Sequence, residues 1–197
     1  MYWVYDSEII CVQLFKGLQL PFTPYHFGPS GFLGLVLRRW IDLPMFLLAN
    51  VIVDVEVLFA PGWPHHRVWH WHTFLVGGIV GAVCGAVLYL ARPVRLVFER
   101  IMRLLRIRYR SCLVGMVLGG MTGVWMHVFI DSLYHFDVEP FWPKTGNPFY
   151  KFARTGDVKI TPDRIEIICI VFFVFAVILY AAAVRSFLKH KHTDAEG

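Results

Sequence analysis

The sequence HVFIDSLYH, from His127 to His135, closes an apolar run that begins near Cys112. On a helix, residues four apart lie one above another, and each step of four drifts by roughly 40°. His127, Asp131 and His135 therefore share one stripe of a predicted membrane-length helix. Two imidazoles and a carboxylate on one stripe are suitable ligands for Zn²⁺ or a similar divalent ion. The alternative interpretation is a hydrogen-bonded His–Asp pair that helps helices to pack.

Apolar runs separated by basic segments indicate a single membrane domain, residues 1–197. The chain is 57% hydrophobic and 17% charged, and its runs at 45–53, 73–90, 112–135 and 165–184 are typical of membrane helices. Residues 1–20 are expected to form a short helix on the membrane surface, and Pro29 is expected to open the first buried helix. We predict an all-α, polytopic membrane protein with about four to five membrane helices. The first is half of a short hairpin that turns at Arg38-Arg39.

The positive charge of the chain is concentrated in one segment, Arg92–Arg110. This segment holds seven Arg and one Glu, while the whole chain has a net charge of +5. It is amphipathic, so we expect an in-plane helix on a leaflet of anionic phospholipid. A cytoplasmic loop that follows the positive-inside rule is the alternative. Because the basicity is local, nucleic acid is not an expected partner.

The basic segments decide which residues can meet. With Arg92–Arg110 in the cytoplasm, Arg38-Arg39 and the basic tail also lie inside, and the loop 136–164 becomes extracytoplasmic. Candidate ligands from separate segments then gather at the outer ends of their helices. These are His26, Asp54, His65, His66, His70, His72, His127, Asp131 and His135.

Two of these segments contain further choices. The stretch 65–72 packs four His and two Trp into eight residues, which favours metal binding over a surface His cluster with aromatic anchors. Asp54 and Glu56 are two apart, so a regular helix aims them at opposite faces. We expect Asp54, which shares its face with Asn50, to be the ligand and Glu56 to lie beside the site.

Taken together, four short motifs resemble the membrane-bound metal-dependent hydrolases, also described as LexA-binding, inner-membrane-associated hydrolases. Residues 23–26, TPYH, look like the opening Thr-Pro-x-His of that family, and residues 53–56, VDVE, resemble its Pro-Asp-x-Asp/Glu with Val53 replacing Pro. Residues 66–75 resemble its His-Arg…His-Ser/Thr-Leu-Leu, with a spacing that leaves His70 and His72 as alternative ligands. Residues 127–135 are similar to its His-x-x-x-Asp-Ser/Ala-x-x-His.

The resemblance implies a hydrolase that holds one or two divalent ions, with zinc as the expected metal. The implied ligands are His26, Asp54, His66, His72, His127 and Asp131. Glu56, or whichever carboxylate is not a ligand, would act as general base, and Arg67 would neutralise developing negative charge. A site at the outer rim of the inner membrane favours a phosphoester or a lipid-linked substrate.

Two other classes of function compete with this hypothesis. A metal-ion or proton transporter would use intramembrane His and Asp as a relay, and it predicts polar residues through the depth of the membrane. The stretches 75–88 and 113–124 contain almost none, which favours a one-sided site. A non-catalytic membrane protein that binds partners through its Gly-rich helix faces would leave the His clusters unexplained.

Overall fold

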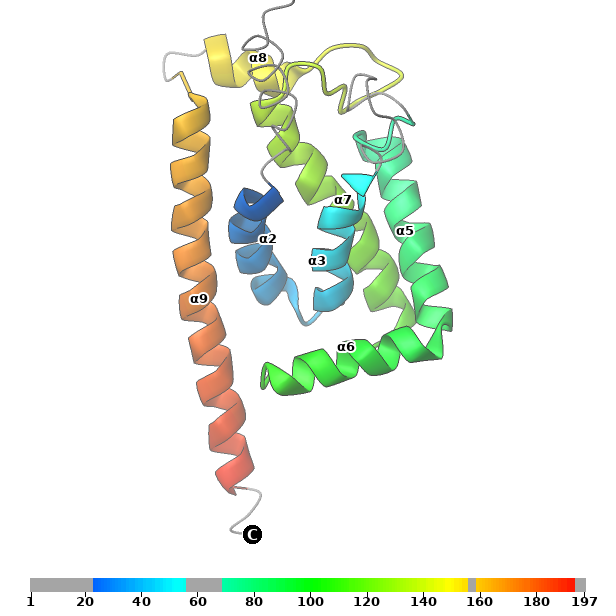
Figure 1. The fold of residues 1–197 in the computed structure, drawn as a ribbon, viewed down its shortest axis with the longest axis vertical. Helices are drawn as coiled ribbons and strands as arrows, with labels where there is room; N and C mark the ends of the chain where they lie inside the picture. The colour runs from blue at the N-terminus through cyan, green and yellow to red at the C-terminus, as the bar shows by residue number, and fades with distance from the viewer. Residues whose placement is uncertain (1–22, 56–68, 156–158, 194–197) are drawn as a thin grey trace, which may run out of the picture.

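The computed structural model describes residues 23–55, 69–155 and 159–193, and within these ranges it contains helices and no strand (Figure 1). The helix predicted for residues 1–20 lies outside the described residues. The all-α expectation is confirmed. The helices are α2 (Thr23–Leu37), α3 (Leu43–Ile52), α5 (Phe74–Leu90), α6 (Arg92–Leu104), α7 (Leu113–Tyr134), α8 (Pro148–Thr155) and α9 (Pro162–Thr193).

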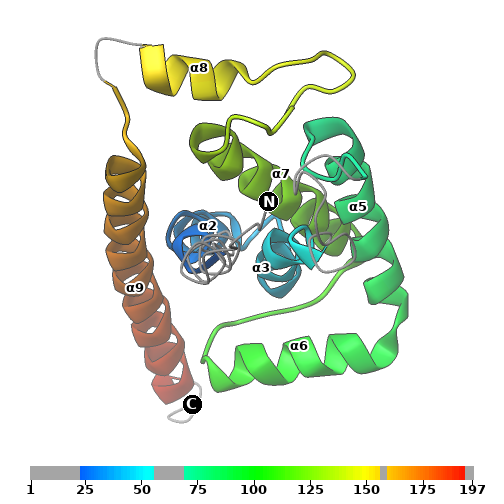
Figure 2. The same cartoon turned by 45° about the horizontal axis from the view of Figure 1, so that its top comes forward.

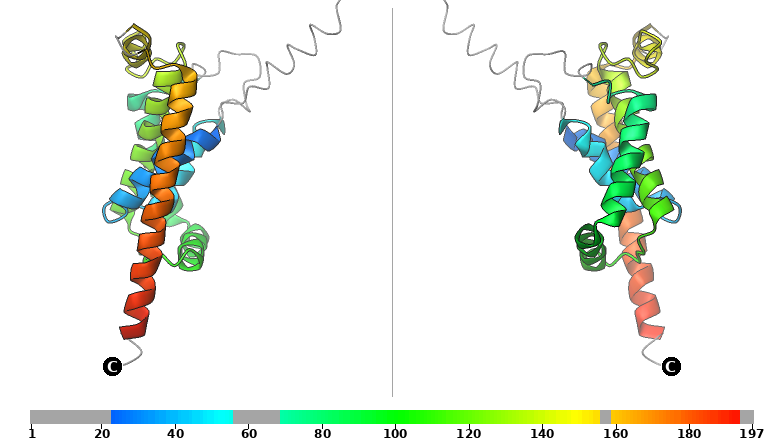
Figure 3. Two further views of the ribbon diagram at one scale, coloured as in Figure 1. Left: turned by 90° about the vertical axis from the view of Figure 1, so that its left-hand side faces the viewer. Right: turned by 90° about the vertical axis from the view of Figure 1, so that its right-hand side faces the viewer.

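Helix α7 is the centre of the arrangement. Helices α3 and α5 both pack along α7, and α2 packs against α3 and against α9 (Figures 1 and 2). Helix α6 runs across the ends of the other helices and is seen end-on in Figure 3, where α7 and α9 are seen lengthwise. Because α6 crosses the ends of the other helices, its direction agrees with the helix in the plane of the membrane that we expected for the basic segment.

Glycines on α7 let two helices approach it along neighbouring grooves. A Cβ added to Gly123 would collide with the carbonyl oxygen of Phe46 in α3, and one added to Gly120 would collide with that of Gly81 in α5. Backbone therefore meets backbone at both contacts, as in the small-residue interfaces of membrane helices. Side chains of α3 and α5 are consequently drawn close to the same stretch of α7.

The surfaces that face away from α7 are apolar and exposed. Leu75, Ile79, Val83 and Val87 form a row with a spacing of four along the outer side of α5. The apolar window of α9, within Asp163–Leu188, is only 11% buried. Such surfaces are stable in contact with lipid and not with water.

The described residues contain two or three candidate membrane spans. Helices α7 and α9 are each long and apolar enough, and α5 with α6 qualifies only as a pair that is bent by 94°. Helices α2 and α3 have 15 and 10 residues, about 22 and 15 Å at 1.5 Å per residue, and a bilayer core is about 30 Å thick. The expectation of four to five spans is therefore met only in part.

Several predicted boundaries were wrong. Helix α2 begins at Thr23 and carries Pro29 inside it, so Pro29 does not open the helix. The predicted loop 136–164 contains α8. Helix α9 continues past 184 to Thr193, because residues 163–193 contain neither Gly nor Pro to end it. Helix α6 ends at Leu104, and Arg106 has a φ of 54°.

The turn between α2 and α3 is fixed to the start of α7. Asp42 caps α3, since its Oδ1 accepts the N–H of Met45 at 3.0 Å, and Asp is a preferred residue at this position of a helix. The N–H of Asp42 donates to the carbonyl of Gly115 at 2.9 Å, and the hydroxyl of Tyr109 donates to Asp42 Oδ2. These bonds set the position of α3 along α7.

Replacing Gly120 with Ala should destabilise the protein, because the new methyl group meets the backbone of α5. Overpacking of this kind typically costs 1–3 kcal/mol, so we expect a destabilisation of about that size. Gly31→Ala is the matched control, because its Cβ would lie 3.5 Å from the Cβ of Ala176, an ordinary contact. It should be neutral, or stabilising by up to about 1 kcal/mol through helix propensity. Thermal unfolding in detergent measures both, and equal loss in the two variants would contradict the two-groove packing.

Candidate metal centre

Helix α7 contributes two adjacent side chains. His127 and Asp131 are 0% and 1% exposed, and His127 Nε2 lies 2.9 Å from Asp131 Oδ2. The predicted stripe of residues four apart is confirmed for this pair. His135 is the C-cap residue of α7 and packs edge-on against the ring of Tyr134, outside the group formed by His127 and Asp131.

Asp54 reaches the same point from the end of α3. The helix ends at Ile52, and the N–H of Asp54 donates to the carbonyl of Val51 at 3.1 Å in the turn that follows. Asp54 Oδ1 lies 3.2 Å from His127 Nε2. Asp54 therefore lies beside His127, as a candidate ligand should. The helix has already ended at this residue, so the argument from a regular helix does not apply to it.

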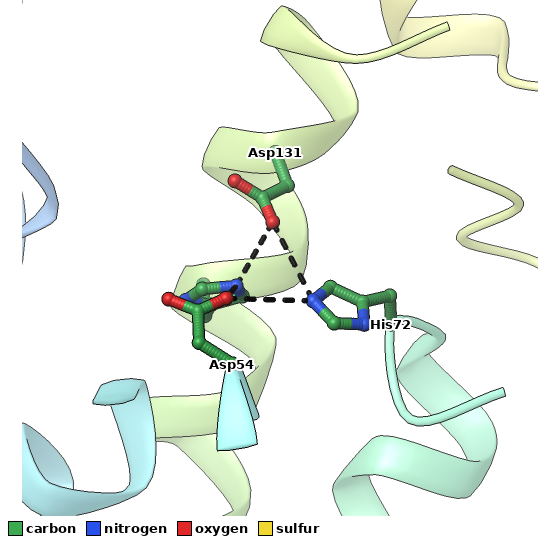
Figure 4. A group of neighbouring side chains, drawn as sticks. Asp54, His72 and Asp131 are labelled. Atoms are coloured by element: carbon green, nitrogen blue, oxygen red, sulfur yellow. Dashed lines mark ion pairs between the residues drawn. The ribbon is translucent and has the colours of Figure 1, made fainter. Parts of the chain in front are cut away.

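His72 arrives from the segment that leads into α5. Thr73 caps α5 by accepting the N–H of Val76 at 3.1 Å, and its own hydroxyl donates to the carbonyl of His70. These bonds fix the chain on either side of His72, which is 0% exposed. His72 Nε2 lies 3.7 Å from both Asp54 Oδ1 and Asp131 Oδ2 (Figure 4). Of the alternatives His70 and His72, the structure places His72 in the group.

Helix α5 is held against α7 next to His72. The indole N–H of Trp125 donates to the carbonyl of Phe74 at 2.7 Å, and the N–H of Phe74 donates to the carbonyl of Pro140 at 2.9 Å. Gly77 and Gly78 leave room for Val124 and Trp125 at the same level. The start of α5 is thus tied both to α7 and to the loop after α7.

His26 lies behind Asp131. Its Nε2 is 3.0 Å from Asp131 Oδ1, and its ring stacks on that of His127 with centroids 4.7 Å apart. Asp131 therefore has one oxygen on His26 and the other on His127. His26 and Asp54 thus both lie against His127, at the same end of the hairpin formed by α2 and α3. In this geometry His26 orients Asp131, as partners of metal-binding carboxylates commonly do, and direct ligation by His26 stays a prediction.

Other predicted site residues lie elsewhere. The ring of His70 stacks on Trp142 with centroids 4.3 Å apart. Glu56, His65, His66 and Arg67 lie outside the described residues. The structure therefore tests neither the predicted general base nor the predicted arginine.

The donor atoms of Asp54, His72, His127 and Asp131 suit a metal ion in spacing. One donor atom from each residue lies within 4.8 Å of the other three. Two ligands about 2.0–2.1 Å from a tetrahedral ion are about 3.3 Å apart. The four measured separations, from 2.9 to 3.7 Å, bracket that value. A separation of 3.7 Å is too long for a hydrogen bond.

The charge of the group also favours a bound metal ion. Two carboxylates with two neutral imidazoles carry −2, and all side chains except that of Asp54 (14% exposed) are at most 2% exposed. A buried charge needs a partner, and a divalent cation balances it completely. Protonation of both imidazoles would also balance it, but the two 3.7 Å contacts of His72 are poor hydrogen bonds for an imidazolium.

The sequence did not predict a buried polar layer one helical turn away. Asn50 Nδ2 donates to Ser30 Oγ at 2.8 Å and to the carbonyl of Gly123 at 3.3 Å. Asn50 and Ser30 are both 0% exposed. Each member is four residues from a site residue on its own helix: Ser30 from His26, Asn50 from Asp54, and Gly123 from His127. That shared spacing is the signal that could have found the layer.

Comparison with known proteins gives no match: no family model, no curated protein and no solved structure matches the chain. The group has to be interpreted from its own chemistry. Two nitrogen and two oxygen donors from three separate segments, enclosed by packed helices, form a donor set that suits zinc and similar divalent ions. A candidate metal centre is the conclusion that its geometry supports.

Proposed function

We propose that this chain is a membrane-embedded metalloprotein, and that its centre is a hydrolytic site formed by Asp54, His72, His127 and Asp131. The observation that carries the proposal is the convergence of four donor atoms within 4.8 Å, at the meeting point of α3, α5 and α7. The hydrolase class is supported by the resemblance of the four sequence motifs to membrane-bound metal-dependent hydrolases.

A divalent ion such as zinc would lower the pKa of a bound water towards about 7 and polarise a phosphoryl or carbonyl oxygen. The chain's own residues divide the remaining tasks. His26 holds Asp131 in position through its 3.0 Å contact. Asp54 has the one partly exposed side chain of the four, at 14%, so the side of the site next to Asp54 is where a substrate enters. Glu56, or whichever carboxylate does not bind the ion, would act as general base, and Arg67 would neutralise developing negative charge.

The position of the group within the fold favours a substrate from the membrane surface. The group lies near the C-terminal end of α7, while the basic helix α6 lies beyond the other end of α7 (Figure 1). With α6 on the cytoplasmic side, the group faces the extracytoplasmic side of an inner membrane. A phosphoester or lipid-linked substrate fits a centre at that depth.

A metal-ion transporter is the second candidate, and the buried Asn50–Ser30 layer favours it, because it extends the polar region one turn deeper. Beyond that layer, Met45 and Phe46 are both 0% exposed; the side chain of Met45 lies against Gly120 of α7 and the ring of Phe46 lies against Gly34 of α2. A path for ions would have to displace these side chains. The one-sided centre is therefore the better-supported function, and metal uptake into proteoliposomes distinguishes the two.

Metal content tests the centre directly. His127→Ala and the nearly isosteric Asp131→Asn should each lower metal affinity by more than about 100-fold, beyond the 10–100-fold typical of changes to groups that only orient ligands. His70→Asn is the control, because Asn tolerates the φ of 55° at this position. It should retain metal. Elemental analysis of purified, monodisperse protein measures all three, and full occupancy in both site variants would overturn the proposal.

The role of His26 can be separated from that of the four ligands. If His26 orients Asp131, His26→Ala should weaken metal affinity about 10–100-fold and leave the stoichiometry at saturation unchanged. His26→Gln, whose amide can still donate to Asp131 Oδ1, should recover part of the loss. Titration with a competing chelator measures both variants. Loss of one equivalent of metal in both variants would instead make His26 a ligand.

The sidedness of the centre can be tested by labelling single cysteines at Lys144 and Arg103, which are both exposed. The background should carry Ser at position 112, because the Cys112 side chain accepts the N–H of Gly115 at the start of α7. On intact cells an impermeant maleimide should label position 144 and not position 103, and permeabilised cells should label both. The reverse pattern would place the centre on the cytoplasmic side.

A further inference from the structure

A cavity of about 80 Å³ lies between the α2–α3 turn and the segment that joins α6 to α7. Its lining includes Arg38, Arg39, Arg108 and Arg110, together with Trp40 and Asp42. At 10–15 Å³ for each water, this volume holds about five to eight water-sized positions. It suits a group with the size of a phosphate. The cavity lies at the opposite end of α3 from Asp54, about 18 Å away along the helix.

The charge of this cavity is strongly positive. Four of its lining residues are arginines, and Asp42 is the single acidic one. Within the described part of the chain, no ion pair joins any of these arginines to a carboxylate, while Arg38 donates to the carbonyl of Leu35. Guanidinium groups that lack carboxylate partners are suited to bidentate binding of phosphate.

Asp42 does not occupy the cavity as a competing anion. It is 4% exposed, and its two oxygens accept the N–H of Met45 and the hydroxyl of Tyr109. Burial, together with the bond to Asp42, raises the pKa of Tyr109, so this hydroxyl stays protonated and keeps Asp42 engaged. The arginines are left to act on a ligand.

Two helices begin at the same cavity. Asp42 and Leu43 mark the start of α3, and Cys112 and Gly115 lie in the first turn of α7. Helix N-termini carry a partial positive charge and favour anions. They add to the field of the arginines that line the same cavity.

The surroundings of the cavity indicate a membrane interface. Trp40, which lines it, is 65% exposed, and Leu104 at the end of α6 is 82% exposed. An exposed Trp beside an amphipathic helix is typical of the level of lipid headgroups. We propose that this cavity binds the phosphate of an anionic phospholipid headgroup. The sequence led us to expect lipid contact along Arg92–Arg110 in general, whereas the cavity assigns it to four arginines, two of which lie outside that segment.

The test compares two double variants of the full chain in neutral detergent. Arg39→Gln with Arg108→Gln removes two charges from the cavity. Arg100→Gln with Arg103→Gln removes two charges from exposed positions of α6 that do not line it. Native mass spectrometry measures binding of dioctanoyl phosphatidylglycerol, with dioctanoyl phosphatidylcholine as the zwitterionic probe with the same tails. Inorganic phosphate serves as the soluble probe.

The unmodified protein should bind phosphatidylglycerol at least about tenfold more tightly than phosphatidylcholine. The cavity variant should lose about tenfold or more of that affinity, and the α6 variant should lose less than about twofold. Inorganic phosphate that binds as tightly as the lipid, and is lost in the same variant, would keep the phosphate site and change its source to a soluble anion. Equal losses in the two double variants, or no preference over phosphatidylcholine, would overturn the proposal. Metal content should stay unchanged in both, so this result is independent of the metal centre.

Discussion

Close contact between backbones along α7 is the constraint on which the rest of the structure depends. Gly119 and Gly123 admit α3, and Gly120 admits α5, on neighbouring grooves of the same helix. Because no side chains separate the helices there, the ends of α3 and α5 are brought to the level of His127. Larger side chains at these glycines would move Asp54 and His72 away from α7, even with every ligand intact. The candidate metal centre is thus a consequence of helix packing as much as of residue identity.

Part of this arrangement could be predicted from the sequence because it depends on local periodicity. The spacing of four between His127 and Asp131 places both on one face wherever a helix forms, and Asp42 with Pro44 marks the start of α3. Asp54 and His26 could be expected to lie close together, because α2 and α3 have similar lengths along their axes and are joined by a turn at Arg38-Arg39. Such inferences need only the geometry of single helices and the position of a turn.

Other features depended on information that periodicity does not carry. The choice between His70 and His72 is set by the Thr73 cap and by the stacking of His70 on Trp142, which are contacts between distant segments. The length of α9 was underestimated because charge was taken as the end of a helix, although no residue there breaks one. The expected number of spans is met only in part: two or three helices are candidates, and α2 and α3, the halves of the expected hairpin, are each too short to cross alone.

The two ends of α3 lie in regions of opposite charge. Asp54 joins a buried group with a surplus of negative charge, which a cation satisfies, while the start of α3 faces arginines that an anion satisfies. Between them lie side chains such as Met45 and Phe46, which are fully buried, so the two charges do not neutralise each other through the protein. The buried group around Asp54 needs a counter-charge, whereas the arginines at the start of α3 are exposed and are available to an external anion. If both proposals hold, the protein would be most stable with a divalent ion at one end of α3 and an anionic headgroup at the other. Because α3 would then be held at both ends, it would position the carboxylate of Asp54.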